Sequence, residues 1–373
     1  MASYLILGRG ILKAGVPYLL QQADTEEIAI IDKDRSVLKL DRMFDNFPER
    51  KIEYILSDIK RLDLVSLFKM YTTIISGLPA KENLVLAEAA IKANRNFCDL
   101  GGVVSIAKEI INLRNKYPSF DKSIVTGTGL MPGDGEIKAQ ALIWEFDQAK
   151  EVSILVTGLP QKPKPPLGYN FPYSSVGLEH VCCDQAPVLE NGEIVWKNPF
   201  SGYKHLTIPE LARFYDKGRV EAFITAGTSL STETFREQGI EEYSELTLRW
   251  DGFAKFFKHV PRNKFQETIR PYLTRPDRND PDFVYMKVSV SGYIDGRWTE
   301  KSISHLDLFD TVTGFTAMER STAIPAVIIA RMMTNGQTKT GINTPETAFN
   351  REQIKLYLKE LNKYFDINRT RYQ

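Results

Sequence analysis

The stretch YLILGRGILKAGVPYLL, residues 4–20, decides the fold. A short apolar run meets a Gly-Arg-Gly turn, and a sequence of helical character follows. In a dinucleotide-binding turn the first glycine allows a tight bend, and the second lets the backbone approach the pyrophosphate. Gly8 and Gly10 occupy these two positions, with Ile11 next, where a helix N-terminus would supply amides for the phosphates. The pattern predicts a cofactor-binding turn made by these three residues.

The third glycine of the G-x-G-x-x-G pattern is missing from this turn. That glycine normally allows the helix and strand to pack closely. Lys13 stands in its place, and Gly15 follows two positions later. We therefore expect altered packing with intact phosphate contacts, and we expect Gly15 to restore part of the lost space.

An acidic residue ends the second apolar run, IAIIDKD. Asp32 lies 24 positions after Gly8, close to the offset at which an acid accepts hydrogen bonds from the adenosine ribose. A carboxylate there repels a 2′-phosphate, so the sequence favours NAD over NADP. Lys33 and Arg35 keep NADP as the less favoured alternative.

Strands and helices alternate through the first third of the chain, which predicts parallel βαβ units of the Rossmann type. Beyond residue 130 the pattern changes to long alternating strands, and SGYIDGRW is typical of a hairpin turn. The predicted fold class is α/β plus α+β, with an N-terminal parallel sheet and a second α+β domain on a mostly antiparallel sheet. We expect a dinucleotide-binding domain at 1–128, a substrate domain at 129–318, and C-terminal helices at 319–373 that return to the first domain or the hinge.

Two further strand ends carry candidate residues, because ligands bind beyond the carboxyl ends of parallel strands. The segment SGLP places Gly77, Leu78 and Pro79 there, as cofactor-binding candidates. The segment CDLGG adds Asp99 and Gly101. Asp99 is a candidate catalytic carboxylate, with helix capping or loop hydrogen bonding as the alternative.

Bulk properties exclude several classes of function. The net charge of +1 favours neither nucleic acid nor an anionic membrane, and no run is long enough to span a bilayer. The three cysteines include an adjacent pair, which fits neither a disulfide framework nor zinc spacing, so we expect no metal site. We expect a cytoplasmic, reduced protein, a homodimer, and a solvated basic tail in NRTRYQ.

Six segments in order make the chain resemble the saccharopine dehydrogenase superfamily, especially its lysine 6-dehydrogenase and carboxynorspermidine dehydrogenase branches. They are SGLPAKENLVLAEAAIKANRNFCDLGG, GLMPGDGEIKA, TGLPQKPKPPLGY, EAFITAGTSLST, YSELTLRWDG and TAMERSTAIPAVIIARMM. The resemblance implies hydride transfer between a nicotinamide and a carbon bonded to an amine nitrogen, on an amino acid or polyamine-like substrate. Departures after Leu178 and after Arg249 leave the substrate open.

The chemistry that the resemblance implies suggests roles for three residues. Amine oxidation needs a neutral amine, so a base must take its proton. His180 and Asp99 are the candidates, and surface or structural histidine is the alternative for His180. Arg249, in the L-R segment, could hold a substrate carboxylate in a two-pronged contact or form a structural ion pair. We expect Glu221 to be structural and the Cys182–Cys183 pair to be inert.

Three alternatives remain open. The proline-dense loop LPQKPKPPLGYNFPY is interpreted as a wall or lid of the active site, although in isolation it would resemble a polyproline ligand. Within enzymes, an imine reductase of the saccharopine or carboxynorspermidine type competes with an amine dehydrogenase. From another class, the chain could bind NAD without turnover, as a sensor or scaffold.

Overall fold

The computed structural model describes residues 2–35, 51–225, 230–365 and 367–372. Contacts divide the chain into two compact units. The first unit contains residues 1–137 and 319–361, and the second contains 138–318 and 362–373. The segment FPER, whose sequence we interpret as a turn, and part of the segment EAFITAGTSLST lie outside the described residues.

The first unit is built on a parallel sheet in the order β15-β6-β5-β4-β1-β2-β3. Its strands are β1 (Ala2–Leu7), β2 (Thr25–Asp32), β3 (Lys51–Leu56), β4 (Thr73–Ser76), β5 (Asn96–Asp99), β6 (Ser123–Thr126) and β15 (Gly341–Asn343). Residues 4–7 of β1 are completely buried. A continuous apolar run is what a central parallel strand covered on both faces requires.

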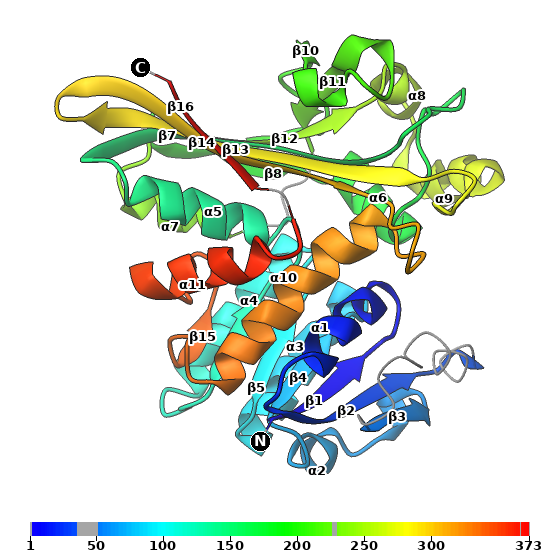
Figure 1. The fold of residues 1–373 in the computed structure, drawn as a ribbon, viewed down its shortest axis with the longest axis vertical. Helices are drawn as coiled ribbons and strands as arrows, with labels where there is room; N and C mark the ends of the chain where they lie inside the picture. The colour runs from blue at the N-terminus through cyan, green and yellow to red at the C-terminus, as the bar shows by residue number, and fades with distance from the viewer. Residues whose placement is uncertain (1, 36–50, 226–229, 366, 373) are drawn as a thin grey trace. The chain divides into compact units, whose positions relative to one another are not determined.

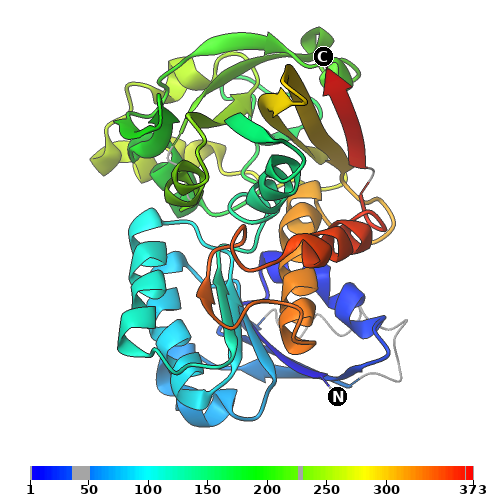
Figure 2. The ribbon, with the colours of Figure 1, turned by 90° about the vertical axis from the view of Figure 1, so that its left-hand side faces the viewer.

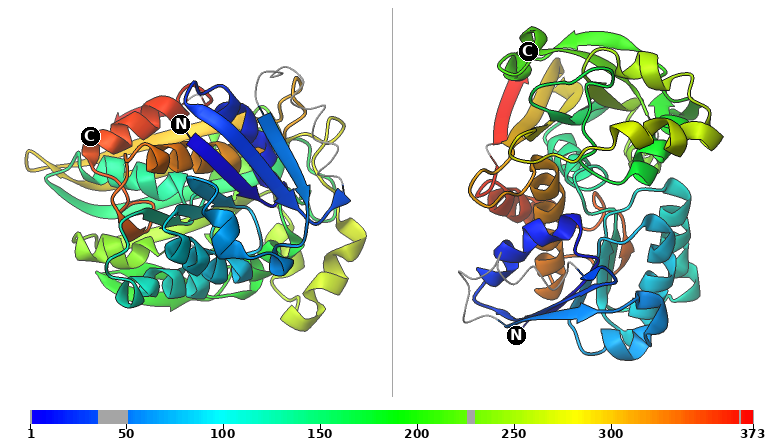
Figure 3. Two further views of the ribbon diagram at one scale, coloured as in Figure 1. Left: turned by 90° about the horizontal axis from the view of Figure 1, so that it is seen from below. Right: turned by 90° about the vertical axis from the view of Figure 1, so that its right-hand side faces the viewer.

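Helices cover both faces of this sheet. The helices of this unit include η1 (Ile11–Gly15, a 3-10 helix), α1 (Val16–Leu20), α2 (Leu64–Phe68), α3 (Ala80–Ala93), α4 (Val104–Lys116), α10 (Ala317–Thr334) and α11 (Arg351–Leu361). Helix α5 (Asp134–Ile143) contains the boundary between the two units. Figures 2 and 3 show α3 and α4 on one face, with α1 and α10 on the other. This is the predicted Rossmann-type layering, and it confirms the fold class for this part of the chain.

The helix that follows β1 is shorter and less regular than predicted. The sequence predicts one helix over ILKAGVPYLLQQA, but the structure has the 3-10 helix η1 followed by the five-residue α1. Pro17 lies in the first turn of α1. Proline is tolerated there because the amides of the first turn have no intrahelical partner, but it prevents a continuous α-helix through this point.

The second unit is built on a nine-stranded mixed sheet, whose main path is β10-β11-β12-β7-β13-β14-β16 (Figure 1). Its strands are β7 (Gln148–Pro160), β8 (Ala186–Glu190), β9 (Glu193–Lys197), β10 (Lys204–Thr207), β11 (Arg219–Ile224), β12 (Glu242–Arg249), β13 (Asp282–Ile294), β14 (Arg297–Leu308) and β16 (Ile367–Tyr372). Along this path only the β12–β7 pair is parallel, so the predicted mostly antiparallel sheet is confirmed.

Local chemistry explains two boundaries in this unit. The hairpin between β13 and β14 turns at Asp295 and Gly296, which both have positive φ (50° and 71°), as a two-residue type I′ turn requires. The buried carboxylate of Asp282 accepts hydrogen bonds from the backbone amides of Ala317 (2.8 Å) and Met318 (3.1 Å). These bonds satisfy amides of the first turn of α10, so they fix where that helix begins.

The basic C-terminal segment is exposed at residues 368–370, as expected, but it is not a free tail. Residues 367–372 form β16, which pairs antiparallel with β14 from His305 to Glu300. The Thr370 hydroxyl also lies 2.6 Å from that of Ser302. The tail is therefore the edge strand of the second sheet.

The short α-helices in the described part of the second unit include α6 (Ser175–Cys183), α7 (Ser231–Glu237), α8 (Phe253–Phe257) and α9 (Phe265–Ile269). Helix α6 begins at Ser174, whose hydroxyl accepts a hydrogen bond from the Val176 amide at 3.2 Å. His180 therefore lies in helix α6.

Candidate functional site

The turn after β1 needs glycine at its first position. Gly8 has a φ of +81°, and a Cβ there would lie 2.9 Å from Leu78 Cδ2. The Gly8 amide donates to Ile31 O (2.8 Å), and the Gly77 amide donates to Leu7 O (2.8 Å). The ends of β1, β2 and β4 are thereby held together at one edge of the sheet.

Asp32 fixes the conformation of this turn. Its Oδ2 accepts a hydrogen bond from the Arg9 amide at 2.9 Å, and its Oδ1 accepts one from the Asp34 amide at 2.9 Å. A carboxylate has about four acceptor positions, so two remain for ribose hydroxyls.

The second glycine faces open space. A Cβ on Gly10 would have no atom within 4 Å. Half-buried Ile11 begins η1 directly after it. The backbone of the turn at Gly10 is therefore open on the side where a side chain would project.

Lys13 and Gly15, which replace the missing third glycine, both contact helix α10. The Lys13 side chain points to α10, where its Nζ lies 2.5 Å from Glu319 Oε1. The close packing occurs at Gly15, where a Cβ would lie 2.6 Å from Val327 Cγ1 and 3.1 Å from Ala323 O. Gly15 therefore allows close packing against helix α10, which differs from the expected relief of helix–strand packing after β1.

Asp99 organises the loops beyond β5 and β6. It is completely buried, and its Oδ1 accepts hydrogen bonds from the Gly101 amide (2.6 Å), the Thr126 hydroxyl (3.2 Å) and the Gly127 amide (3.3 Å). Its Oδ2 is buried without a hydrogen-bond partner. Burial raises the pKa of Asp99 to about 6, although the three hydrogen bonds oppose this shift.

The remaining candidates of this edge have mainly structural contacts. A Cβ on Gly77 would lie 2.9 Å from the Leu12 side chain of η1. Close packing against this helix therefore requires glycine at position 77. The Leu78 amide donates to Ser76 Oγ (3.4 Å), and Pro79 is the residue before α3. Any contribution of Leu78 and Pro79 to cofactor binding stays a prediction.

In the second unit, Arg249 is a buried cation. Its side chain lies at the end of β12, the residue is 4% exposed, and Nη1 donates to Leu248 O (2.8 Å) and Thr157 Oγ1 (3.3 Å). Its Nε is buried without a hydrogen-bond partner, and among the described residues it makes no ion pair. Buried charges are normally paired, so an unpaired guanidinium is a strong candidate for binding an anionic ligand.

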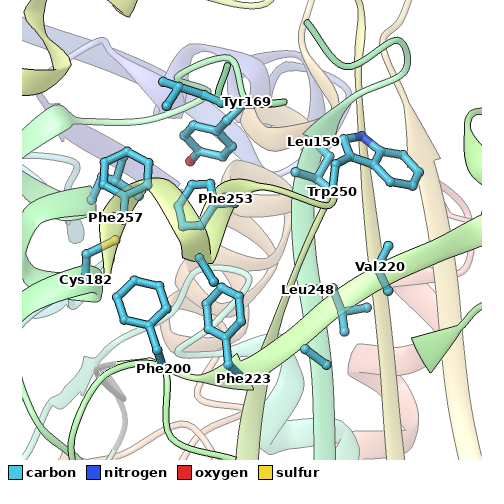
Figure 4. Packing of buried hydrophobic residues seen from close by; sticks show 14 of the residues in the cluster. Leu159, Tyr169, Cys182, Phe200, Val220, Phe223, Leu248, Trp250, Phe253 and Phe257 are labelled. Atoms are coloured by element: carbon cyan, nitrogen blue, oxygen red, sulfur yellow. The ribbon is translucent and has the colours of Figure 1, made fainter. Parts of the chain in front are cut away.

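Two aromatic rings enclose the Arg249 guanidinium. Its Cζ lies 5.0 Å from the centre of the Tyr169 ring and 5.1 Å from that of Phe253. Figure 4 shows these two rings next to each other within a larger aromatic cluster. Tyr169 comes from the proline-dense loop, so part of that loop forms a buried wall of this cluster.

His180 lies in a different environment. Its Nδ1 is 2.8 Å from Asp184 Oδ2, and the Arg262 guanidinium contacts His180, Asp184 and Glu179. The structure gives His180 no contact with Arg249. Its side chain is 29% exposed. These contacts favour the alternative in which His180 is a surface residue within an ionic network.

Sequence reasoning missed two residues around Arg249. Tyr169 and Phe253 were not considered as its neighbours. Glu221 is buried, and its carboxylate accepts hydrogen bonds from the Gly252 amide (2.9 Å) and the Ala254 amide (2.8 Å), which agrees with the structural role expected for it. The aromatic residues of the proline-dense loop were the available signal for Tyr169.

Within the described ranges, one group of side chains could hold a metal ion. It consists of His205, Glu221 and Asp251, whose ligand atoms lie within 4.8 Å of one another. His205 Nε2 already lies 3.1 Å from Asp251 Oδ1, and Arg219 also pairs with Asp251.

No helix in the described part of the chain is long and apolar enough to cross a membrane.

The glycine turn after β1 and the acid that ends β2, on a parallel sheet covered on both faces, define a dinucleotide-binding unit of the Rossmann type. Residues 129–367 match the model of the saccharopine dehydrogenase C-terminal domain. The chain therefore belongs to the saccharopine dehydrogenase superfamily, a family of nicotinamide-dependent oxidoreductases.

Two solved structures share this fold over nearly the whole chain. Apo saccharopine dehydrogenase (L-Glu forming) from Saccharomyces cerevisiae is 16% identical, with a TM-score of 0.77 and all of both chains covered. Homospermidine synthase from Legionella pneumophila, in complex with NAD, is 12% identical, with a TM-score of 0.68 and 99% of this chain and 91% of that chain covered. At these identities the likeness shows the fold.

Proposed function

We propose that this protein is an NAD-dependent dehydrogenase that transfers a hydride at a C–N bond of an amino acid, as lysine 6-dehydrogenase does with a side-chain amine. The observation that carries the proposal is the hydrogen bond between Asp32 and the Arg9 amide. It holds the glycine turn and the ribose-binding acid in one arrangement, within a chain of this family.

The residues of the first unit fit a dinucleotide. The open space beside Gly10 would take the pyrophosphate, and Asp32 would accept the ribose hydroxyls. When bound, NAD supplies the hydride acceptor. Asp32 favours NAD because a 2′-phosphate would place negative charge beside a carboxylate that two amides already fix.

Arg249 supports an amino-acid substrate. Nη1 is engaged by the Leu248 carbonyl and the Thr157 hydroxyl, whereas Nε has no partner. A carboxylate would therefore bind along the Nε edge, and the two flanking rings would fix the plane of the guanidinium. This edge is buried, so binding requires a movement of Tyr169 or Phe253.

Oxidation of an amine requires removal of its proton, and we propose Asp99 as the first residue to test for this role. Burial gives its carboxyl group a pKa of about 6, in the range useful for proton transfer at neutral pH. His180 is the second candidate, because Asp184 orients its ring. The ring nitrogen Nε2 would then be the one to accept the proton.

A panel assay tests the proposal. Lysine, ornithine, saccharopine, carboxynorspermidine and simple diamines are each incubated with NAD or NADP, and absorbance at 340 nm is followed at alkaline pH. We expect NAD-dependent turnover of at least one amine that carries a carboxylate. Imine reduction with NADH from an aldehyde and an amine would support the reductase alternative. No turnover, with NAD still bound, would leave a non-catalytic NAD-binding protein.

A further inference from the structure

The strands β11 and β12 place two buried ionisable residues opposite each other. Glu221 and Arg249 are partners in the antiparallel register. Residues directly opposite in such a pair have their side chains on the same face, with Cβ atoms about 4.5–5.5 Å apart. Glu221 is 3% exposed and Arg249 is 4% exposed.

The two residues nevertheless form no ion pair. The Glu221 carboxylate turns to the segment after β12, where Oε1 accepts from the Gly252 amide (2.9 Å) and Oε2 accepts from the Ala254 amide (2.8 Å). The Tyr203 hydroxyl donates to Oε1 as well, at 3.1 Å. The carboxylate thus accepts hydrogen bonds from the backbone amides on both sides of Phe253.

Phe253 links these hydrogen bonds to Arg249, because its ring packs against the guanidinium. Its ring centre lies 5.1 Å from the guanidinium carbon, and it meets the Tyr169 ring edge to face at 5.4 Å. The turn that carries Phe253 begins at Gly252, which has a φ of +102°, a conformation that glycine adopts readily. We propose that Glu221 is a positioning residue: by fixing the backbone around Phe253, it holds one wall of the Arg249 site and sets the orientation of the guanidinium toward a substrate carboxylate.

This inference rests on the proposed use of Arg249 as a carboxylate receptor. It gives Glu221 a role in substrate binding that acts through Phe253, with no contact to the substrate. A residue that only stabilised the fold would change the melting temperature and leave Michaelis constants unchanged.

The test compares Glu221→Gln with Glu242→Gln. Glu242 lies at the other end of β12 and also accepts a backbone amide, that of Asn191 at 2.8 Å, so it is a matched control. In glutamine an NH₂ group replaces one of the two carboxylate oxygens, so one of the two backbone amides would face a donor in place of its acceptor. For a carboxylate-bearing amine we expect Glu221→Gln to raise KM about tenfold, the effect of one weakened charge-assisted hydrogen bond, with kcat and the KM for NAD nearly unchanged. Glu242→Gln should leave all three constants unchanged.

A second measurement needs no substrate. The ¹⁵N–¹H signal of Arg249 Nε, assigned by its loss in Arg249→Lys, reports the ring currents of the two flanking rings. We expect Glu221→Gln to move this signal and Glu242→Gln to leave it in place. If Glu221→Gln does not fold, Glu221→Asp serves, because the shorter side chain cannot reach both amides.

The outcomes separate the two proposals. An unchanged KM together with an unmoved Nε signal in the Glu221 variant would overturn the positioning role. If no amine of the panel is turned over by the wild-type protein, the proposed function fails, and the Nε signal alone decides the role of Glu221. In a double variant with Phe253→Leu, the two effects on KM should be strongly non-additive, whereas additive effects would also overturn the proposal.

Discussion

The Asp32 carboxylate holds the Arg9 backbone amide at 2.9 Å across 23 residues of sequence. One side chain at the end of β2 therefore orders the turn at the end of β1. In such an arrangement the acid that would select the ribose also shapes the site for the pyrophosphate, so its removal should affect both.

We expect Asp32→Ala to weaken NAD binding roughly 10- to 150-fold, the effect of losing a charge-assisted hydrogen bond of about 1.5–3 kcal/mol. The preference for NAD over NADP should narrow, but NADP should not bind tightly, because the turn also loses its support. Titration calorimetry with both cofactors measures this. Asp34→Ala is the control, since the exposed Asp34 side chain forms a 3.8 Å ion pair with the Arg9 side chain and leaves the Asp32 carboxylate in place. A wild-type protein that prefers NADP would refute the assignment of Asp32.

The second prediction concerns the phosphate-binding turn. Lys13→Gly should change the Kd for NAD by no more than a few fold, because the lysine side chain is paired with Glu319 and takes no part in the turn. Gly10→Val should abolish binding, because its side chain would project into the open space that the pyrophosphate needs. Equal and large losses of affinity in both variants, measured by fluorescence titration, would contradict this account.

Gly15→Ala tests the packing of η1 on α10. The added Cβ would lie 2.6 Å from Val327 Cγ1, so we expect a loss of about 1–3 kcal/mol in the free energy of unfolding. The second substitution Val327→Ala should recover part of this loss, although the Ala323 carbonyl at 3.1 Å remains. Denaturant unfolding of the single and double variants provides the measurement. Full stability of Gly15→Ala would mean that α10 does not pack closely on this position.

Asp99→Asn should lower kcat far more than it weakens NAD binding, if the carboxyl group takes the proton of the reacting amine. Asparagine keeps the Oδ1 acceptor for the Gly101 and Gly127 amides, so the loops should remain in place. Steady-state kinetics and NAD titration measure the two effects. Unchanged turnover would assign Asp99 to loop structure alone.

The same variant has a pH signature in stability. The folded-state pKa of Asp99, about 6, lies above its ordinary value of 3.8 because of burial. The contribution of this group is then fully present below pH 4 and is lost as the pH rises through 6, by up to about 3 kcal/mol. The free energy of unfolding of Asp99→Asn, measured relative to wild type, should therefore increase between pH 4 and pH 7. A pH-independent difference would contradict the raised pKa.

Arg249→Ala should lower kcat/KM roughly 10- to 150-fold for an amine that bears a carboxylate. Arg249→Lys should not restore it, because an ammonium cannot make the two-pronged contact along the Nε edge. Diamines without a carboxylate should be nearly indifferent to both changes. Turnover of diamines alone, unaffected by Arg249→Ala, would exclude the carboxylate role.

Local patterns predicted most of the elements that surround the candidate site. The apolar run of β1, the acid at the end of β2 and the Asp295-Gly296 hairpin depend on neighbouring residues, so they could be predicted from the sequence. The helix around His180 had a local signal as well, the capping residue Ser174, which sequence reasoning missed.

The remaining features depend on residues far apart in the chain. Gly15 meets Val327, Tyr169 covers Arg249, and the C-terminal segment pairs with β14. No periodicity or spacing within one segment encodes such a partner, because the contact exists only after the chain has returned. The burial of Arg249 was missed for this reason: its neighbours come from segments that have no pattern in common.

The return of α10 to the first unit has a consequence for how the protein is made. Val327, which Gly15 contacts, is synthesised only after the entire stretch 138–318. At a translation rate of about 5–20 residues per second, the ribosome needs roughly 10 to 35 seconds for that stretch. During this time the glycine turn and one face of its sheet are exposed, because helix α10, which covers them, has not yet been synthesised. The nascent chain should therefore be most susceptible to proteases and most dependent on chaperones in this interval.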